Sequence, residues 1–230
     1  MEFRTLVALT LTTLFSLVGC RSEDSADVNQ DSIYTGYELF YNQNDDVTHA
    51  IARFRFGGPL GTVLELTQDS GAQVTFNGDN LNYSGFWGAH HREYAGNLTQ
   101  GTFVYTNTEG ATFTNHVPTG SSIGFPDGFT TINKSQSQTL TWEGTALATN
   151  DHVGVFVGSW AWGDDALFYV TGFGTTELVM GVNQLSNLPV GTAVVFMDRW
   201  NEENVMEGTP EGGKIRYKYR GTNATVNVEE

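Results

Sequence analysis

Apolar and polar residues alternate with a period of two along most of this chain from about residue 32 onward. Tyr37, Leu39 and Tyr41 fall on one face of a predicted strand, and 50–56 repeat the pattern after an Asn- and Asp-rich turn. Successive side chains of a strand point to opposite faces, so this spacing predicts half-buried β-strands. Clusters of Gly, Asn, Asp and Pro, as at 77–80, predict turns between the strands.

The predicted strands fall into two groups. The first, 32–120, contains a hairpin pattern in which 103–105 and 111–114 flank an Asn-Thr-Glu-Gly turn. Breaker residues and weak periodicity mark 121–130 as a linker, and strands resume in 131–230. A sustained 3.6-residue period is absent from the sequence. We therefore predict an all-β fold with two tandem Ig-like β-sandwich domains, at 32–120 and 131–230.

The N-terminal pattern differs, because an apolar segment there ends at the only cysteine of the chain. Residues 6–18 are apolar apart from Thr and Ser, and this segment is short for a transmembrane helix, which needs about 20 residues. Arg4 precedes it, and Gly19 offers the small side chain that signal peptidases require. Ordinary secretion and a cytosolic N-terminal strand are alternatives, although the sequence lacks an A-x-A-like cleavage site.

The tetrad Leu17-Val18-Gly19-Cys20 resembles the lipobox of bacterial lipoproteins. The resemblance implies that 1–19 form a lipoprotein signal peptide and that Cys20 becomes the lipidated first residue of the mature protein. Attachment of more than one acyl chain, such as palmitate, gives stable membrane anchoring. Arg21, rather than Asp, follows the cysteine, which by the same resemblance favours the outer membrane, at its periplasmic or its surface side.

The net charge limits the kinds of partner that the mature chain can bind, and the cysteine content limits how it can be stabilised. The formal net charge of −15 argues against nucleic-acid binding and against electrostatic attraction to anionic lipid. After the lipidated Cys20, residues up to 31 are almost all polar or acidic, so 20–31 are predicted to be a disordered tether. Without a second cysteine the chain has no internal disulfide, and the hydrophobic core must stabilise the folded part.

Several passages resemble known β-sandwich modules. Leu140-Thr141-Trp142 resembles an early core strand of Ig-like or fibronectin-like domains, and 185–191 resemble the link that precedes a later strand. Val74–Gly78, with Tyr94 further on, resembles a pattern of bacterial envelope lipoproteins. The resemblance implies a β-sandwich envelope protein and brings no activity with it.

The catalytic motifs S-x-x-K and H-E-x-x-H are missing from the chain, which favours a protein that is not an enzyme. A hydrolase with an unrecognised carboxylate site is the alternative. His90 and His91 are adjacent, so a strand would point them to opposite faces and prevent them from binding one metal together. We interpret all five histidines as surface or strand-edge residues, with a zinc site from distant histidines as the weaker alternative.

Oxygen-rich segments are interpreted as turns. Asp and Asn favour turns through side-chain bonds to the backbone, but clustered oxygen ligands also suit Ca²⁺. A structural Ca²⁺ is therefore the weaker alternative, and no other cofactor is predicted. These segments are 42–46, 79–80, 164–165 and 202–204.

Tryptophans in loops or at strand ends are the candidate ligand-binding residues. A sugar ring stacks on an exposed aromatic face while carboxylates bind its hydroxyls. The competing interpretation is that these tryptophans, and Trp200 with them, pack in or over the hydrophobic core, because a buried aromatic side chain covers about 150–250 Å². The candidate glycan-binding set is Trp87, Trp160, Trp162, Asp164 and Asp165.

Basic residues alternate on one predicted strand near the C-terminus, at Lys214, Arg216, Lys218 and Arg220. They could form a docking strip for an acidic partner. We prefer to interpret them as a solvated strand face whose charges discourage edge-to-edge aggregation.

These observations predict a membrane-anchored envelope lipoprotein that acts as a non-catalytic binding or structural accessory module. The predicted partners are the membrane, through the N-terminal lipid, and another envelope protein or a glycan, with no nucleic acid. A glycan-binding surface lipoprotein and a hydrolase are the alternative functions.

Overall fold

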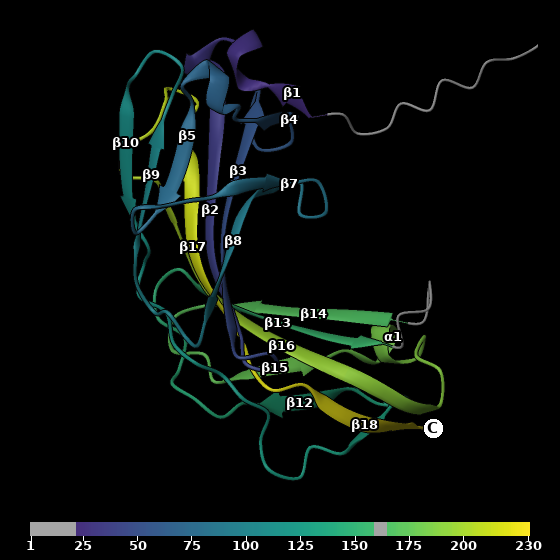
Figure 1. The fold of residues 1–230 in the computed structure, drawn as a ribbon. Helices are drawn as coiled ribbons and strands as arrows, with labels where there is room; N and C mark the ends of the chain where they lie inside the picture. Colours follow the sequence, from purple (N-terminus) through teal and green to yellow (C-terminus); the bar gives the residue numbers. More distant parts are fainter. Residues whose placement is uncertain (1–21, 159–164) are drawn as a thin grey trace, which may run out of the picture.

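The computed structural model of the protein describes residues 22–158 and 165–230, which form mainly β-strands (Figure 1). The all-β fold class predicted from the alternation is confirmed. Among the described residues, no helix is long and apolar enough to span a membrane. The elements in chain order are β1 (Glu23–Asp24), η1 (Ser25–Asp27), η2 (Gln30–Ser32), β2 (Ile33–Asn42), β3 (Val47–Phe56), β4 (Thr62–Glu65), η3 (Gln68–Ser70), β5 (Gln73–Phe76), β6 (Asp79–Asn80), β7 (Asn82–Ser84), β8 (Ala89–Ala95), β9 (Thr102–Thr106), β10 (Thr112–His116), β11 (Thr131–Asn133), β12 (Gln138–Thr141), β13 (Asp151–Gly158), β14 (Asp165–Thr171), β15 (Glu177–Met180), α1 (Val182–Leu185), β16 (Gly191–Asn204), β17 (Gly213–Arg220) and β18 (Ala224–Glu229).

One large sheet runs through both halves of the described structure. It has 12 strands, and its main path is β1-β4-β3-β2-β17-β16-β13-β14. Strands β2 and β17 lie far apart in sequence but pair in parallel, from Thr35 opposite Gly213 to Asn42 opposite Arg220. Figure 1 shows that the sheet bends, so β13 and β14 lie at an angle to β2 and β3. The C-terminal strands therefore complete the sheet that the N-terminal strands begin.

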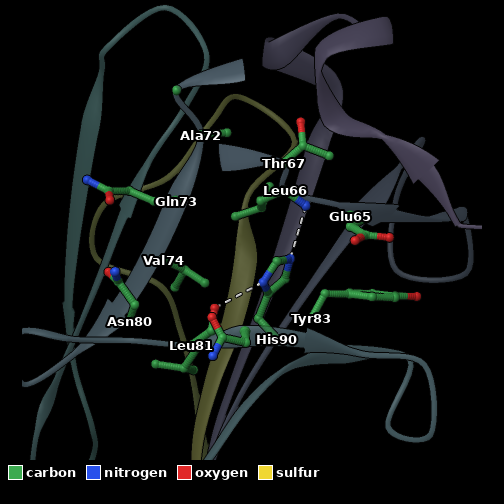
Figure 2. Close-up of a pocket in the computed structure, with 12 residues that line it drawn as sticks. Glu65, Leu66, Thr67, Ala72, Gln73, Val74, Asn80, Leu81, Tyr83 and His90 are labelled. Atoms are coloured by element: carbon green, nitrogen blue, oxygen red, sulfur yellow. Dashed lines mark hydrogen bonds between the residues drawn. The ribbon is translucent and has the colours of Figure 1, made fainter. Parts of the chain in front are cut away.

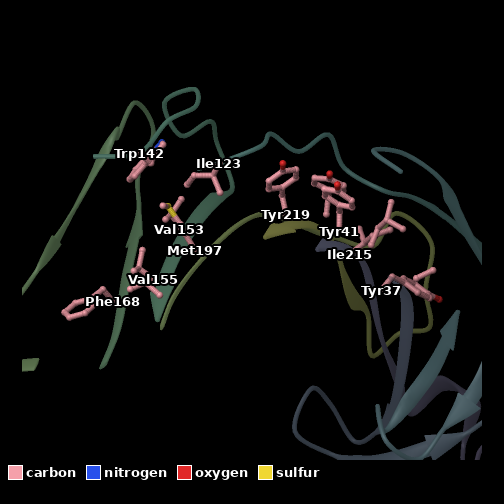
Figure 3. Close-up of a cluster of buried hydrophobic side chains, with 14 of the residues drawn as sticks. Tyr37, Tyr41, Ile123, Trp142, Val153, Val155, Phe168, Met197, Ile215 and Tyr219 are labelled. Carbon is pink, nitrogen blue, oxygen red and sulfur yellow. The ribbon is translucent and has the colours of Figure 1, made fainter. Parts of the chain in front are cut away.

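Two smaller sheets cover one side of the large sheet. The first is β10-β9-β5-β6 and the second is β12-β15. Aromatic residues join the layers of the first half: Phe103 stacks on Tyr37 with ring centroids 5.0 Å apart, and Tyr105 lies 4.6 Å from Phe54. Figure 3 shows that the buried side chains lie on the convex side of the bent sheet, among them Tyr41, Met197 and Tyr219.

The predicted turn at 77–80 shows how local sequence sets a strand pair. Phe76 and Asp79 face each other across the β5–β6 pair, with Asn77 and Gly78 between them. Both loop residues have positive φ, 51° and 89°. Asn and Gly tolerate this conformation best, and it gives the two-residue hairpin turn whose twist matches the strands.

Ordered structure begins before the position predicted for it. Residues 20–31 were predicted to be a disordered tether, but β1 pairs in parallel with β4, from Glu23 opposite Leu64. Gln30 is buried, and its side-chain nitrogen donates to the carbonyl of Ser25 at 2.7 Å. The tether prediction is therefore wrong for 22–31, because polar side chains can be buried when hydrogen bonds satisfy them.

The predicted linker at 121–130 does not separate two independent sheets. Figure 1 shows two packed regions, as two sandwiches would give, but the large sheet continues from one to the other. Residues 213–220, assigned to the second predicted domain, pair with 35–42 of the first. Local periodicity could not predict this, because it reports the faces of a strand and not its neighbours in the sheet.

Candidate functional site

The concave side of the bent sheet presents a continuous face of side chains, which we call the concave face. Residues alternate along each strand, so those that do not point into the core point to this side. Both smaller sheets lie on the opposite, convex side (Figures 1 and 3). Strand register aligns one row of the concave face across β8, β3, β2, β17, β16 and β13, formed by Glu93, His49, Phe40, Lys218, Trp200 and His152.

The basic residues of β17 are paired with acids on this face. Arg216 forms an ion pair with Glu38, and Lys218 Nζ lies 2.8 Å from Asp198 Oδ2. Strand β17 has β2 on one side and β16 on the other, so it is not an edge strand. The interpretation that the charges of 214–220 discourage edge-to-edge aggregation is therefore wrong, although their face is accessible to solvent. These charges form cross-strand ion pairs inside the sheet.

A hollow of about 300 Å³ opens on the concave face above β13, β14, β16 and β17, and we call it the aromatic hollow. Gly154 forms its floor, with Tyr169 and Asp198 opposite it on the two neighbouring strands. A Cβ atom at this position would lie 3.3 Å from Trp200 Cζ3, so the absence of a side chain lets the Trp200 ring lie close against the floor. The apolar walls are Phe156, Leu167, Phe196 and Trp200, and the polar side is formed by Asp198, Lys218 and Arg220.

Asp198 is held ionised by its basic neighbours. Arg220 Nε and Nη2 donate to its two carboxylate oxygens at 2.7 and 2.8 Å. Burial opposes ionisation, but the hydrogen bonds from Arg220 and the charge of Lys218 outweigh it and hold the pKa of Asp198 below its ordinary value. The guanidinium of Arg220 also lies over the rings of Phe40 and Phe196, 5.4 and 5.1 Å from their centroids. The polar side of the hollow is therefore fixed in position.

Two histidines and a glutamate meet at the other end of the concave face, and we call them the imidazole cluster. His49 comes from β3, and His91 and Glu93 come from β8. His49 Nδ1 lies 3.0 Å from His91 Nε2 and 3.7 Å from Glu93 Oε1. Burial lowers the pKa of both histidines, which favours neutral rings. Trp87 stacks on His91 with ring centroids 4.7 Å apart.

The adjacent histidines separate as predicted. His91 belongs to the concave face, whereas His90 is 3% exposed on the core side. The interpretation of all five histidines as surface or strand-edge residues is wrong for His90 and for His49, which is 9% exposed. The sequence misses their burial because neither lies in an apolar run on its own strand face.

Figure 2 shows that His90 lines a second pocket, of about 540 Å³, between β4, β5 and β7. The backbone N–H of Leu66 donates to His90 Nε2 at 3.0 Å, and His90 Nδ1 lies 3.3 Å from the carbonyl oxygen of Leu81. Nε2 is thus an acceptor and Nδ1 carries the hydrogen. Burial, partly offset by the Leu81 carbonyl, lowers the pKa of His90 to about 4. We assign His90 a structural role, because it joins two segments in its neutral form.

The stability of the protein should fall as the pH falls from about 6.5 toward 4, through the protonation of His90. The unfolded chain binds this proton near pH 6.5, whereas the folded chain binds it only near pH 4. Over that window the unfolded state holds more protons, so acid favours unfolding by up to about 3 kcal/mol. Urea unfolding at pH 7, 5.5 and 4.5 measures the effect. The His90→Asn variant should show a smaller loss over the same window, and an equal loss would contradict the assignment.

Only part of the predicted glycan-binding set falls within the described residues. Trp87 is half-buried in the turn between β7 and β8, and Asp165 is exposed at the first position of β14. Trp160, Trp162 and Asp164 lie outside the described residues, as does Cys20. Among the described residues, the aromatic side chains that line the aromatic hollow are Phe156, Phe196 and Trp200. The alternation of residues 196, 198 and 200 is visible in the sequence. Their position beside Gly154 is not, because it depends on strand pairing.

Where the structure describes them, the oxygen-rich segments form turns and strand ends. Asn42 Oδ1 accepts the backbone N–H of Asn44 at 3.2 Å, and the hydroxyl of Tyr41 lies 2.9 Å from Asp46 Oδ1. Glu202 lies on the concave face and pairs with Lys214 at 3.9 Å. These are the side-chain bonds expected of Asp and Asn in turns and of cross-strand ion pairs. The structural Ca²⁺ stays an untested prediction.

Comparison with known proteins gives little guidance. No family model and no curated protein matches the chain. One similar solved structure is the crystal structure of the two tandem V-type regions of VCBP3, a v-region-containing chitin binding protein, at 8% identity and a TM-score of 0.21. The match covers 81% of this chain and 98% of that one. A likeness this weak carries no argument about ligand or activity, so the function must be argued from the geometry.

Proposed function

We propose that this chain is a bacterial envelope lipoprotein, anchored through an acylated Cys20, whose folded part is a non-catalytic binding module. Its binding surface is the concave face, and its ligand is a glycan that enters the aromatic hollow. The observation that carries the proposal is the hollow itself, which has Gly154 at its floor, aromatic walls on one side and a fixed Asp198–Arg220 pair on the other.

The make-up of the hollow supports a small ligand with one apolar and one polar side. Small-molecule sites are concave, mostly apolar and equipped with a few placed polar groups, and a volume of about 300 Å³ is at the lower end of their range. Leu167 of the wall is 62% exposed, so ligand can reach the hollow from solvent. A sugar ring has both required surfaces, since its C–H face stacks on an aromatic ring and its hydroxyls bind charged side chains.

The pairing of the polar residues favours a neutral glycan over a charged ligand. Arg220 and Lys218 pair with Asp198, so the hollow carries no large net charge of either sign. The oxygens and N–H groups of these side chains can still bond to hydroxyl groups. The same pairing supports a binding role and not a catalytic one, because an acid held ionised by two bases cannot donate a proton in glycoside hydrolysis.

Substitution of Trp200 should weaken glycan binding at least about tenfold, which corresponds to roughly 1.4 kcal/mol. Trp200 gives the hollow its largest aromatic surface, and truncating a central aromatic residue of a binding site costs about this much or more. The detergent-solubilised full-length protein would first be tested on an array of defined oligosaccharides. The affinity of the best binder would then be measured by calorimetry for the wild type and the Trp200→Ala variant.

Two further variants make this experiment decisive. Leu167→Lys places a long charged chain in the wall at an exposed position, so it should block binding without unfolding the protein. Phe173→Ala removes an 84% exposed aromatic side chain outside the hollow and should bind as the wild type does. Equal affinity of the wild type and both hollow variants would contradict the proposed site, and a wild type that binds no oligosaccharide would contradict the ligand class.

A further inference from the structure

We propose that the imidazole cluster, His49, His91 and Glu93, binds one divalent transition-metal ion. This site lies on the concave face but away from the aromatic hollow, and it does not depend on the proposed glycan binding. It combines three residues from two neighbouring strands that no sequence motif connects.

The register of β3 and β8 builds the cluster. His49 lies directly opposite Glu93, and His91 is two residues before Glu93 on the same face of β8. The three ligand atoms, one from each side chain, all lie within 4.8 Å of one another. This places a carboxylate and two imidazoles around one point without any change of backbone.

The two distances from His49 Nδ1 to the other ligand atoms are close to those around a tetrahedral ion. Metal–nitrogen bonds of about 2.0–2.1 Å at tetrahedral angles place two ligand atoms about 3.3 Å apart. The measured separations are 3.0 Å between His49 Nδ1 and His91 Nε2, and 3.7 Å between His49 Nδ1 and Glu93 Oε1. An ion between them would replace the single hydrogen that the two imidazoles share.

The surroundings of the cluster fix the rings in place. Phe40 stacks on His49 with centroids 5.5 Å apart, and Trp87 covers His91 at 4.7 Å and an interplanar angle of 29°. An apolar shell of this kind orients the ligands and limits the access of water. Glu93 is the exposed member of the cluster, with a side chain 60% accessible, so the ion can enter from solvent on that side.

The ligand types select the metal. Two imidazoles and one carboxylate suit Zn²⁺ and Cu²⁺, whereas Ca²⁺ and Mg²⁺ prefer sites made entirely of oxygen. Three protein ligands leave the fourth position of a tetrahedral ion to water or to a ligand bound on the concave face. By the general affinity order of divalent metals, Cu²⁺ should bind more tightly than Zn²⁺.

Calorimetric titration of the metal-stripped, detergent-solubilised full-length protein with ZnCl₂ and with CuSO₄ tests the proposal. The wild type should bind one equivalent. The Glu93→Gln variant changes an exposed side chain by one atom, so it should fold normally and bind at least tenfold more weakly. His49→Asn should lose binding further, and circular dichroism would check that both variants keep their strands.

Matched controls locate the ion. His116→Asn changes a histidine that contacts Thr102 on the smaller β10-β9-β5-β6 sheet, whereas the cluster lies on the large sheet, and should bind metal as the wild type does. Cu²⁺ should also quench the fluorescence of Trp87, and Trp87→Phe should remove that part of the quenching while one equivalent still binds. The absence of wild-type binding, or unchanged binding in Glu93→Gln, would overturn the proposal.

Discussion

Replacing Cys20 with alanine should abolish the incorporation of an acyl label into this protein and remove the protein from the outer-membrane fraction. Lipidation of the lipobox cysteine is what the Leu17-Val18-Gly19-Cys20 resemblance implies. Each buried CH₂ of an acyl chain contributes about 0.8 kcal/mol to membrane binding, so loss of the chains removes essentially all of the anchoring energy. Growth with a clickable palmitate analogue, followed by membrane fractionation and immunoblotting, measures both effects.

The neighbouring residue gives the matched control for this experiment. Arg21→Lys keeps the charge that follows the cysteine and should be labelled and fractionated as the wild type is. A wild-type protein that takes up no label, or a Cys20→Ala variant that still appears in the outer membrane, would show that the lipobox interpretation is wrong. The result does not depend on the ligand of the concave face, so it tests the anchor alone.

In the proposed function, the lipid anchor attaches the protein to the membrane and the concave face binds the ligand. Strand β1 begins at Glu23, close in sequence to the predicted attachment site at Cys20, and it pairs with β4. A chain that becomes ordered this soon after its lipid would hold the folded part close to the membrane. The ligand of such a module would then be a component of the envelope itself or one that reaches its surface.

Strands were predictable from the sequence because their signal is local. Tyr37, Leu39 and Tyr41 alternate as a half-buried strand requires, and all three are buried in the core. The Asn77-Gly78 turn was predictable for the same reason, because Asn and Gly both tolerate the positive φ that this turn requires. The parallel pairing of β2 with β17 was not, because it joins residues about 180 positions apart and depends on the whole fold.

The candidate sites could be predicted even less well, since each is a property of strand register. The aromatic hollow exists because Gly154 lies between Asp198 and Tyr169, and the imidazole cluster exists because His49 lies opposite Glu93. Each of these residues is unremarkable on its own strand. The opposite orientation of His90 and His91 was predictable, because it requires only the two-residue period of a single strand.

The role of the basic residues of β17 shows the same limit. Alternation places Lys214, Arg216 and Lys218 on one face, which the sequence predicts correctly. Whether those charges are paired depends on the strands beside β17, and Glu38 of β2 and Asp198 of β16 supply the opposite charges. An alternating charge pattern therefore indicates a shared face but cannot show whether the charges are free to bind a partner.

Replacing Asp151 with alanine should lower the free energy of unfolding by about 3–5 kcal/mol, a large share of the roughly 5–15 kcal/mol that stabilises a typical domain. Arg199 is 1% exposed and forms an ion pair with Asp151 inside the second packed region. Its guanidinium also donates to the carbonyls of Thr145 and Ala146, at 2.8 and 3.1 Å. Without the carboxylate, the arginine would be left as a buried, uncompensated charge.

Urea denaturation of the wild type and the variant measures this loss, with the slope of the transition confirming that both unfold to the same extent. Burial raises the energy of the Asp151 carboxylate, yet the hydrogen bonds from Arg199, Ala148 and Asn201 outweigh it and keep its pKa below the ordinary value. The pair is therefore ionised at neutral pH, where the measurement is made. Lys214→Ala is the matched control, because the Lys214–Glu202 pair is 3.9 Å apart and 46% of the lysine side chain is accessible, so its loss should cost under about 1 kcal/mol. If the two variants lost equal stability, the Asp151–Arg199 pair would not be what holds the 145–151 segment on β16.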